Sequence, residues 1–128
     1  MNVHFLDDDY ATNRYHEITL NTVAQELNME LTFFNHPEEL LENYVQTEKV
    51  PDVLFCDVNM PTMKCWELVE RFTQMFPDAT TEFVLLTTAL DPVISEKAQE
   101  YPMIKDITTK FLGEDYLRAY KLCSNEKK

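Results

Sequence analysis

Glycine is almost absent from this 128-residue sequence, which contains a single one, Gly113. A loop that cradles the phosphates of a nucleotide needs several glycines, because its backbone must approach the ligand closely and adopt positive φ angles. The sequence therefore excludes a glycine-rich nucleotide-binding loop. Basic residues are scarce too, with 11 Lys and Arg against 23 Asp and Glu and a formal net charge of -12. Nucleic-acid binding depends on Lys and Arg that neutralise phosphates, so direct binding to nucleic acid is excluded as well.

Long apolar runs are missing. No run exceeds four residues, and the chain reaches Asp7-Asp8-Asp9 within six residues of Met1. A membrane-spanning helix needs about 20 apolar residues and a secretory signal an apolar stretch of about 7 to 15. We therefore expect neither, and predict a cytoplasmic protein without a membrane partner.

Cysteine is limited to Cys56, Cys65 and Cys123, an odd number with no pair two residues apart. This spacing indicates neither a disulfide framework nor a zinc site shared with the three histidines. We expect reduced thiols that are mostly buried.

Apolar, strand-like runs alternate with helical patterns along the whole chain. This alternation is typical of βα units and a parallel sheet, and the length fits one domain over 1–128 with 125–128 as a solvated tail. Because crossovers between parallel strands are right-handed, we predict a doubly wound α/β fold of five βα units. The strand-like runs lie at 3–6, 30–34, 53–56, 83–86 and 104–109.

Helices are predicted between these runs from apolar side chains that recur at helical spacing. Two of the helices also have start signals, Asn35-His36-Pro37-Glu38 and Asp91-Pro92, in which a capping residue precedes a proline. The first helix has one face of His16, Leu20, Val23, Ala24 and Leu27, the second a buried face of Leu40, Leu41, Tyr44 and Val45, and the third a face of Trp66, Val69, Phe72 and Phe76. Tyr116, Tyr120 and Cys123 mark the last helix.

Polar side chains follow four of the predicted strands. Asp7 and Asp8, Asp57, Thr87 and Lys110 each stand where a strand ends. In an open parallel sheet these ends share one edge, so we expect the residues to converge there. Two unit charges about 5 Å apart repel by roughly 3 kcal/mol at an effective dielectric of about 20, so three carboxylates need a partner. The pattern predicts a divalent cation.

Four motifs occur in order over nearly the whole chain. They are Phe5-Leu6-Asp7-Asp8-Asp9, Leu54 to Met63 (Leu-Phe-Cys-Asp-Val-Asn-Met-Pro-Thr-Met), Leu85-Leu86-Thr87-Thr88-Ala89, and Lys110 after the last strand. In this combination the sequence resembles the receiver domain of two-component response regulators. The resemblance implies a flavodoxin-like (βα)5 sheet of strand order 2-1-3-4-5.

The resemblance also implies a role for each site residue. Asp57 would be the phosphoacceptor, and Asp7, Asp8, Asp57 and the backbone carbonyl of Asn59 would hold Mg²⁺, a cation that prefers oxygen ligands. Thr87 and Lys110 would contact the phosphoryl group and transmit its presence. The implied donor is a sensor histidine kinase or a histidine phosphotransfer protein. Output would pass to a downstream protein target.

Three positions depart from the receiver pattern. Lys64-Cys65 stands where receivers carry a glycine, so we expect a rebuilt loop or a strained residue. Phe111 replaces the usual proline after the lysine, and we expect a trans bond there because a cis bond before a non-proline residue is rare. Ile107 replaces an aromatic residue and cannot serve as an aromatic switch.

Two other functions stay open. The altered positions would suit a pseudo-receiver, which binds partners without phosphorylation. An aspartate-nucleophile phosphatase with Mg²⁺ would need an acidic residue two positions after the nucleophile, where this chain has Asn59. The docking surface that the resemblance implies is Asn13 and Arg14 with Phe111 and Leu112.

Overall fold

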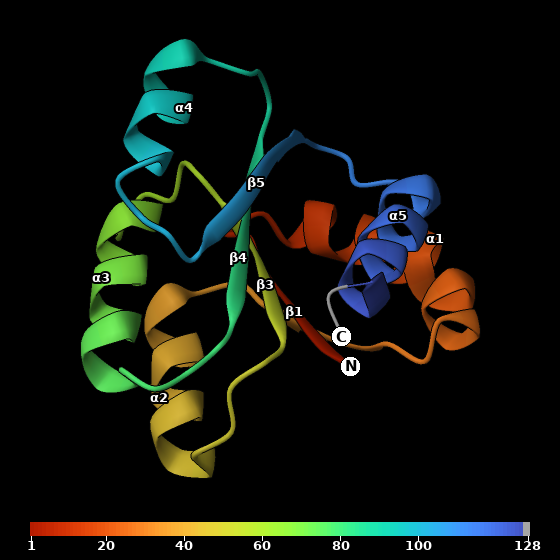
Figure 1. Ribbon diagram of the computed structural model, residues 1–128, viewed down its shortest axis with the longest axis horizontal. Coiled ribbons are helices and arrows are strands. Elements are labelled where there is room, and N and C mark those ends of the chain that lie inside the picture. Colours follow the sequence, from red (N-terminus) through yellow and green to blue (C-terminus); the bar gives the residue numbers. More distant parts are fainter. Residues whose placement is uncertain (127–128) are drawn as a thin grey trace.

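The computed structural model describes residues 1–126 and has the predicted order of alternating strands and helices (Figure 1). Five parallel strands form one sheet of order β2-β1-β3-β4-β5, which confirms the fold class. None of its helices is long and apolar enough to cross a membrane, over the part of the chain that the structure describes. The elements are β1 (Asn2–Leu6), α1 (Tyr10–Glu26), β2 (Glu30–Phe34), α2 (Pro37–Thr47), β3 (Val53–Asp57), α3 (Cys65–Met75), β4 (Glu82–Thr87), α4 (Pro92–Ala98), β5 (Ile104–Thr109) and α5 (Glu114–Glu126).

The sheet separates two hydrophobic clusters, as the alternating direction of side chains along a strand requires. Figure 1 shows α1 and α5 on one face, with α2, α3 and α4 on the other. Phe5 and Phe55 belong to the α1/α5 cluster, whereas Leu54 and Phe83 belong to the other. All five residues of β3 are buried, because this central strand is covered on both faces.

Strand register aligns the ends that carry the predicted site residues. Leu6 pairs with Cys56, so Asp7 and Asp57 follow at the same level, and Thr87 pairs with Thr109. The next residue along the chain from Thr109 is Lys110.

Helix starts agree with the sequence only in part. The Asp91 carboxylate caps α4 by accepting a hydrogen bond from Val93 N at 2.8 Å. In contrast, α2 begins after His36 without a side-chain cap, and Asn35 Nδ2 donates to the Asp7 carbonyl. Pro37 at the first turn has no N–H to satisfy, which lowers the need for a cap.

One predicted core position is wrong, because Val45 on α2 is 56% exposed. The neighbouring Tyr44 is fully buried and anchors this helix. Cys56 and Cys65 are buried and Cys123 is exposed, which agrees with the expectation that the thiols are mostly buried.

Left-handed backbone occurs at Asn28 (φ 55°) and Glu48 (φ 58°), which end α1 and α2 without a glycine. Gly113, in contrast, does not have a positive φ, and a Cβ there would meet nothing within 4 Å.

Trp66 and Tyr101 connect α3 to the segment after α4. Their rings stack with centroids 5.7 Å apart, and the Tyr101 hydroxyl donates to Glu70 Oε1 at 2.6 Å.

Candidate functional site

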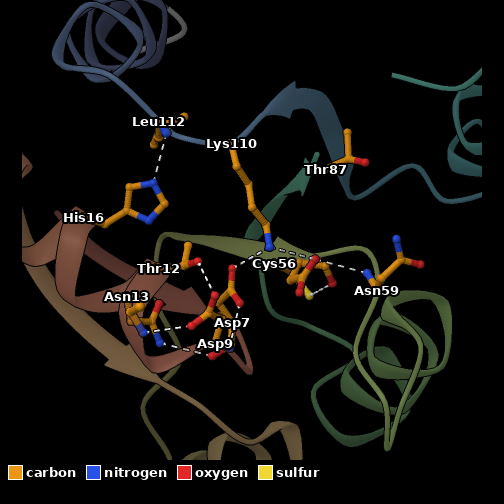
Figure 2. Close-up of polar contacts among 12 residues, drawn as sticks. Asp7, Asp9, Thr12, Asn13, His16, Cys56, Asn59, Thr87, Lys110 and Leu112 are labelled. Atoms are coloured by element: carbon orange, nitrogen blue, oxygen red, sulfur yellow. Dashed lines mark hydrogen bonds and ion pairs between the residues drawn. The ribbon is translucent and has the colours of Figure 1, made fainter. Parts of the chain in front are cut away.

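Three strands bring one ammonium group and two carboxylates together at the carboxyl edge of the sheet. Lys110 Nζ lies 2.8 Å from Asp7 Oδ2 and 3.3 Å from Asp57 Oδ1 (Figure 2). The side chain of Lys110 is 12% exposed, that of Asp7 2% and that of Asp57 7%. At such depth the attraction between the groups is stronger than at a solvated surface.

Asp7 is held by contacts at its side chain and its backbone. Its Oδ1 accepts a hydrogen bond from Asp9 N at 2.9 Å. Its carbonyl accepts from Asn13 Nδ2 at 3.2 Å and from Asn35 Nδ2 at 3.1 Å. The sequence predicted other roles for these two asparagines, a helix start for Asn35 and a docking surface for Asn13, and did not predict that both bind the backbone that places Asp7.

Asp57 is positioned by the turn that follows β3. Its Oδ1 accepts from Asn59 N at 3.1 Å, in addition to the contact with Lys110. Burial, together with the neighbouring Asp7 carboxylate, raises the pKa of Asp57 to about 6 against the opposing effect of Lys110. Burial alone would lower the pKa of Lys110, but its pairing with Asp7 and Asp57 outweighs burial and raises it.

The carboxylates satisfy the geometric requirement for a bound cation. Ligand oxygens of Asp7, Asp8 and Asp57 all lie within 4.8 Å of one another, and Asp8 is the most solvent-accessible of the three. Hard oxygen donors at this spacing suit Mg²⁺, which keeps several of its waters. The donor set therefore fits the predicted ion.

Thr87 lies at the same edge but is turned away from the carboxylates. Its Oγ1 donates to the Ala89 carbonyl at 2.9 Å, and Figure 2 shows its side chain apart from the Lys110 cluster. Asn59 is exposed and contacts Asp57 through its backbone N–H. The part predicted for its carbonyl stays a prediction.

The arrangement matches solved structures along nearly its whole length. A two-component response regulator from Cytophaga hutchinsonii superimposes with a TM-score of 0.84, at 22% identity and with 97% of this chain and 96% of that chain covered. The chemotaxis protein CheY4 of Vibrio cholerae gives a TM-score of 0.75 at 22% identity, covering 93% of both chains. The BeF3-activated receiver domain of DrrB gives 0.74 at 22% identity, covering 98% of this chain and 97% of that chain.

This chain has the receiver-domain fold. No protein-family model matches the sequence. No curated protein matches it in sequence either.

The loop after β5 differs from the prediction at Phe111, the residue that replaces the proline of the receiver pattern. The Lys110-Phe111 peptide bond is cis, so the predicted trans bond is wrong. Contacts on both sides define this backbone, since Lys110 N donates to Thr87 O at 2.8 Å and Leu112 N donates to His16 Nε2 at 2.9 Å.

The other two departures are accommodated without left-handed backbone. Lys64 has a φ of -70° and precedes α3, whose first residue Cys65 is fully buried. Burial raises the pKa of the Cys65 thiol to about 12, so it stays protonated at neutral pH. Ile107 is half-buried and packs against the α2/α3 cluster, so no aromatic ring occupies this position.

The docking surface implied by the resemblance is only partly exposed. Asn13 and Leu112 are 5% and 3% exposed, so these two side chains offer little surface to a partner, and the docking surface stays a prediction. Asn13 instead binds backbone carbonyls. Phe111 is 55% exposed and packs on Tyr15, with ring centroids 4.6 Å apart.

Proposed function

We propose that the chain is a phosphoacceptor receiver that takes a phosphoryl group on Asp57. The proposal depends above all on one observation. The Lys110 ammonium lies between the Asp7 and Asp57 carboxylates in a site formed from β1, β3 and the end of β5. A purely structural ion pair would need one carboxylate, whereas this site has three within 4.8 Å.

The chemistry follows from the two oxygens of Asp57. Lys110 and Asn59 N both contact Oδ1, so we assign the attack on phosphorus to Oδ2. A new O–P bond forms while the N–P bond of a phosphohistidine breaks, and the imidazole nitrogen keeps the electron pair and takes a proton. The implied donors are a sensor histidine kinase or a histidine phosphotransfer protein.

Mg²⁺ would be held by Asp7, Asp8 and Asp57, with the Asn59 carbonyl as a further proposed ligand. When bound, the ion offsets negative charge on the phosphoryl oxygens and on the carboxylates. Lys110, which follows β5 and already contacts both Asp7 and Asp57, supplies a second positive charge.

Thr87 would then respond to the phosphoryl group on Asp57. Its hydroxyl now donates to Ala89 O, and a phosphoryl oxygen on Asp57 offers a charged acceptor, which forms a stronger hydrogen bond than a neutral carbonyl does. Exchange of partners would move the β4–α4 segment and change affinity for a downstream protein target.

The direct test is phosphorylation by acetyl phosphate with Mg²⁺, followed by intact mass. We expect one acid-labile phosphoryl group on the wild type and none on Asp57→Asn. Asp52→Asn is the matched control, because it changes the same charge at the opposite end of β3 and should leave phosphorylation intact.

Two other outcomes would contradict the proposal. A phosphoryl group that also forms on Asp57→Asn would assign the acceptor elsewhere. No phosphoryl group on a folded, Mg²⁺-binding wild type would favour a pseudo-receiver that signals without phosphorylation. Turnover of a phosphate ester is not expected, because Asn59 stands where a phosphatase of this type needs an acid and a base.

A further inference from the structure

His16 is a fully buried histidine that the proposed chemistry does not use. It lies on α1, and its ring packs against Phe5 at 5.3 Å and Phe111 at 5.8 Å between centroids. An apolar side chain could fill the same space, and the neighbouring buried positions of this helix, Leu20 and Val23, are apolar.

Over residues 1–126, the ring of His16 makes one hydrogen bond, to a residue 96 positions further along the chain. Nε2 of His16 accepts from Leu112 N at 2.9 Å in a buried contact, which Figure 2 shows between α1 and the loop after β5. Leu112 stands two residues after Lys110, whose own N–H donates to Thr87 O at 2.8 Å. The 110–112 segment is therefore fixed at both ends.

The tautomer follows from this contact. Because Nε2 accepts a hydrogen bond, the proton of the neutral ring is on Nδ1. Burial lowers the pKa of His16 to about 4, so the ring is neutral at neutral pH. Within residues 1–126, Nδ1 has no hydrogen-bond partner. An unpaired buried N–H destabilises the fold, so packing alone does not account for a histidine here.

We infer that His16 is a positioning residue, which binds Leu112 N and thereby holds the Lys110 ammonium between Asp7 and Asp57. The effect on phosphorylation depends on the proposed function, whereas the effect on the loop does not. His16 on α1 thus positions Lys110, which lies 94 positions further along the chain.

The structural arm of the test uses NMR on the unphosphorylated protein. We expect ¹⁵N shifts that assign the proton to Nδ1. His16→Phe, which keeps an aromatic ring and removes the acceptor, should speed amide exchange at Lys110 and Leu112 about tenfold or more relative to exchange elsewhere in the sheet. His16→Gln should restore most of the protection, because its Oε1 can replace Nε2 as acceptor.

Val23→Ala is the control for general loosening of α1, since it removes buried volume from the same helix and the same hydrophobic cluster but leaves the acceptor of Leu112 N in place. Equal acceleration in this variant would overturn the inference, and so would a proton on Nε2 in the wild type. If His16→Phe does not fold, the wild-type tautomer and the Gln variant still decide the result.

The functional arm measures the rate of phosphorylation by acetyl phosphate in Mg²⁺. His16→Phe should lower it about tenfold, equivalent to about 1.4 kcal/mol of barrier. In a Lys110→Ala background the same change should have no further effect, because the positioned group is gone. A full additional loss there would overturn the inference. A wild type that takes no phosphoryl group would contradict the proposed function only, because the amide exchange still tests the loop.

Discussion

Two features of Asp57 disfavour its ionised form, because its side chain is buried, with 5% of the residue exposed, and a second buried carboxylate, Asp7, is its neighbour. The raised pKa of about 6 means that the folded protein binds a proton at Asp57 more tightly than the unfolded chain, where the pKa is about 4. Stability contributed by this group is therefore present at acidic pH and is lost as pH rises from about 4 to 6.

The consequence at the residue scale concerns Asp57→Asn without Mg²⁺. We expect the free energy of unfolding to rise by on the order of 1 to 2 kcal/mol above pH 6, and the gain to shrink towards zero near pH 4. Thermal melts of both proteins in EDTA across this range provide the measurement. A gain of constant size at every pH would mean that repulsion at Asp57 is not its source.

Other residues of the site show why sequence analysis was incomplete. Asp7, Asp57 and Lys110 could be predicted to converge, because each follows an apolar run and parallel strands end at one edge. Asn13, Asn35 and His16 could not, since their partners are distant in sequence and no local pattern marks them. His16 even matched the apolar face of its helix, which concealed its hydrogen bond.

At the scale of elements, the shortage of glycine has a measurable effect on α2. Glu48 ends this helix with a φ of 58°, and its N–H donates to Tyr44 O at 2.9 Å. Glu48→Gly should raise the free energy of unfolding by about 0.5 to 1 kcal/mol, since glycine adopts this conformation without a Cβ penalty. Chemical denaturation measures it. Glu48→Ala removes the same carboxylate but keeps the penalty, and a gain of equal size there would assign the effect to charge.

The segment from β4 to α4 carries the second prediction at this scale. Because Ile107 provides no aromatic ring to swing, the phosphorylated state should act through the Thr87 hydroxyl. Thr87→Ala should bind BeF3 at Asp57 while losing most of the chemical-shift response over residues 88–99. Thr88→Ala, a change at the exposed neighbour, should respond as the wild type does. A full chemical-shift response over residues 88–99 in Thr87→Ala would show that the coupling does not depend on the Thr87 hydroxyl.

The positions of the strands and helices were largely predictable from local sequence patterns, whereas details that depend on packing were not. Strand positions followed from compact apolar runs, and α1, α3 and α4 from spacing or from caps. The exposure of Val45 could not be predicted from spacing, because packing decides whether an apolar position at the margin of a helical face points to the sheet or to solvent. The cis bond between Lys110 and Phe111 could not be predicted, because peptide bonds before non-proline residues are almost always trans.

For the whole molecule, a net charge of -12 makes every cation stabilising to some degree, so a specific Mg²⁺ site must be separated from general screening. An ion that binds only the folded state adds about 1.4 kcal/mol when present at tenfold its Kd. We expect Mg²⁺ to raise the Tm more than NaCl of equal ionic strength does. Asp8→Asn should abolish this excess.

Asp9→Asn is the matched variant, since it removes the same charge at the adjacent position, where Asp9 caps α1 instead of facing the cluster. It should keep the Mg²⁺ effect. Equal Mg²⁺ effects in wild type and Asp8→Asn would remove the metal from the proposed site.

The stacking of Trp66 on Tyr101 has a practical consequence, because Trp66 is the single tryptophan of the chain. Indole fluorescence from this protein therefore comes from one place, at the junction of α3 and the end of α4. Emission intensity and lifetime depend on the distance and orientation of the neighbouring phenol. The unlabelled molecule thus contains its own optical probe of whether α3 and α4 shift relative to each other, readable on the timescale of a stopped-flow mixing experiment.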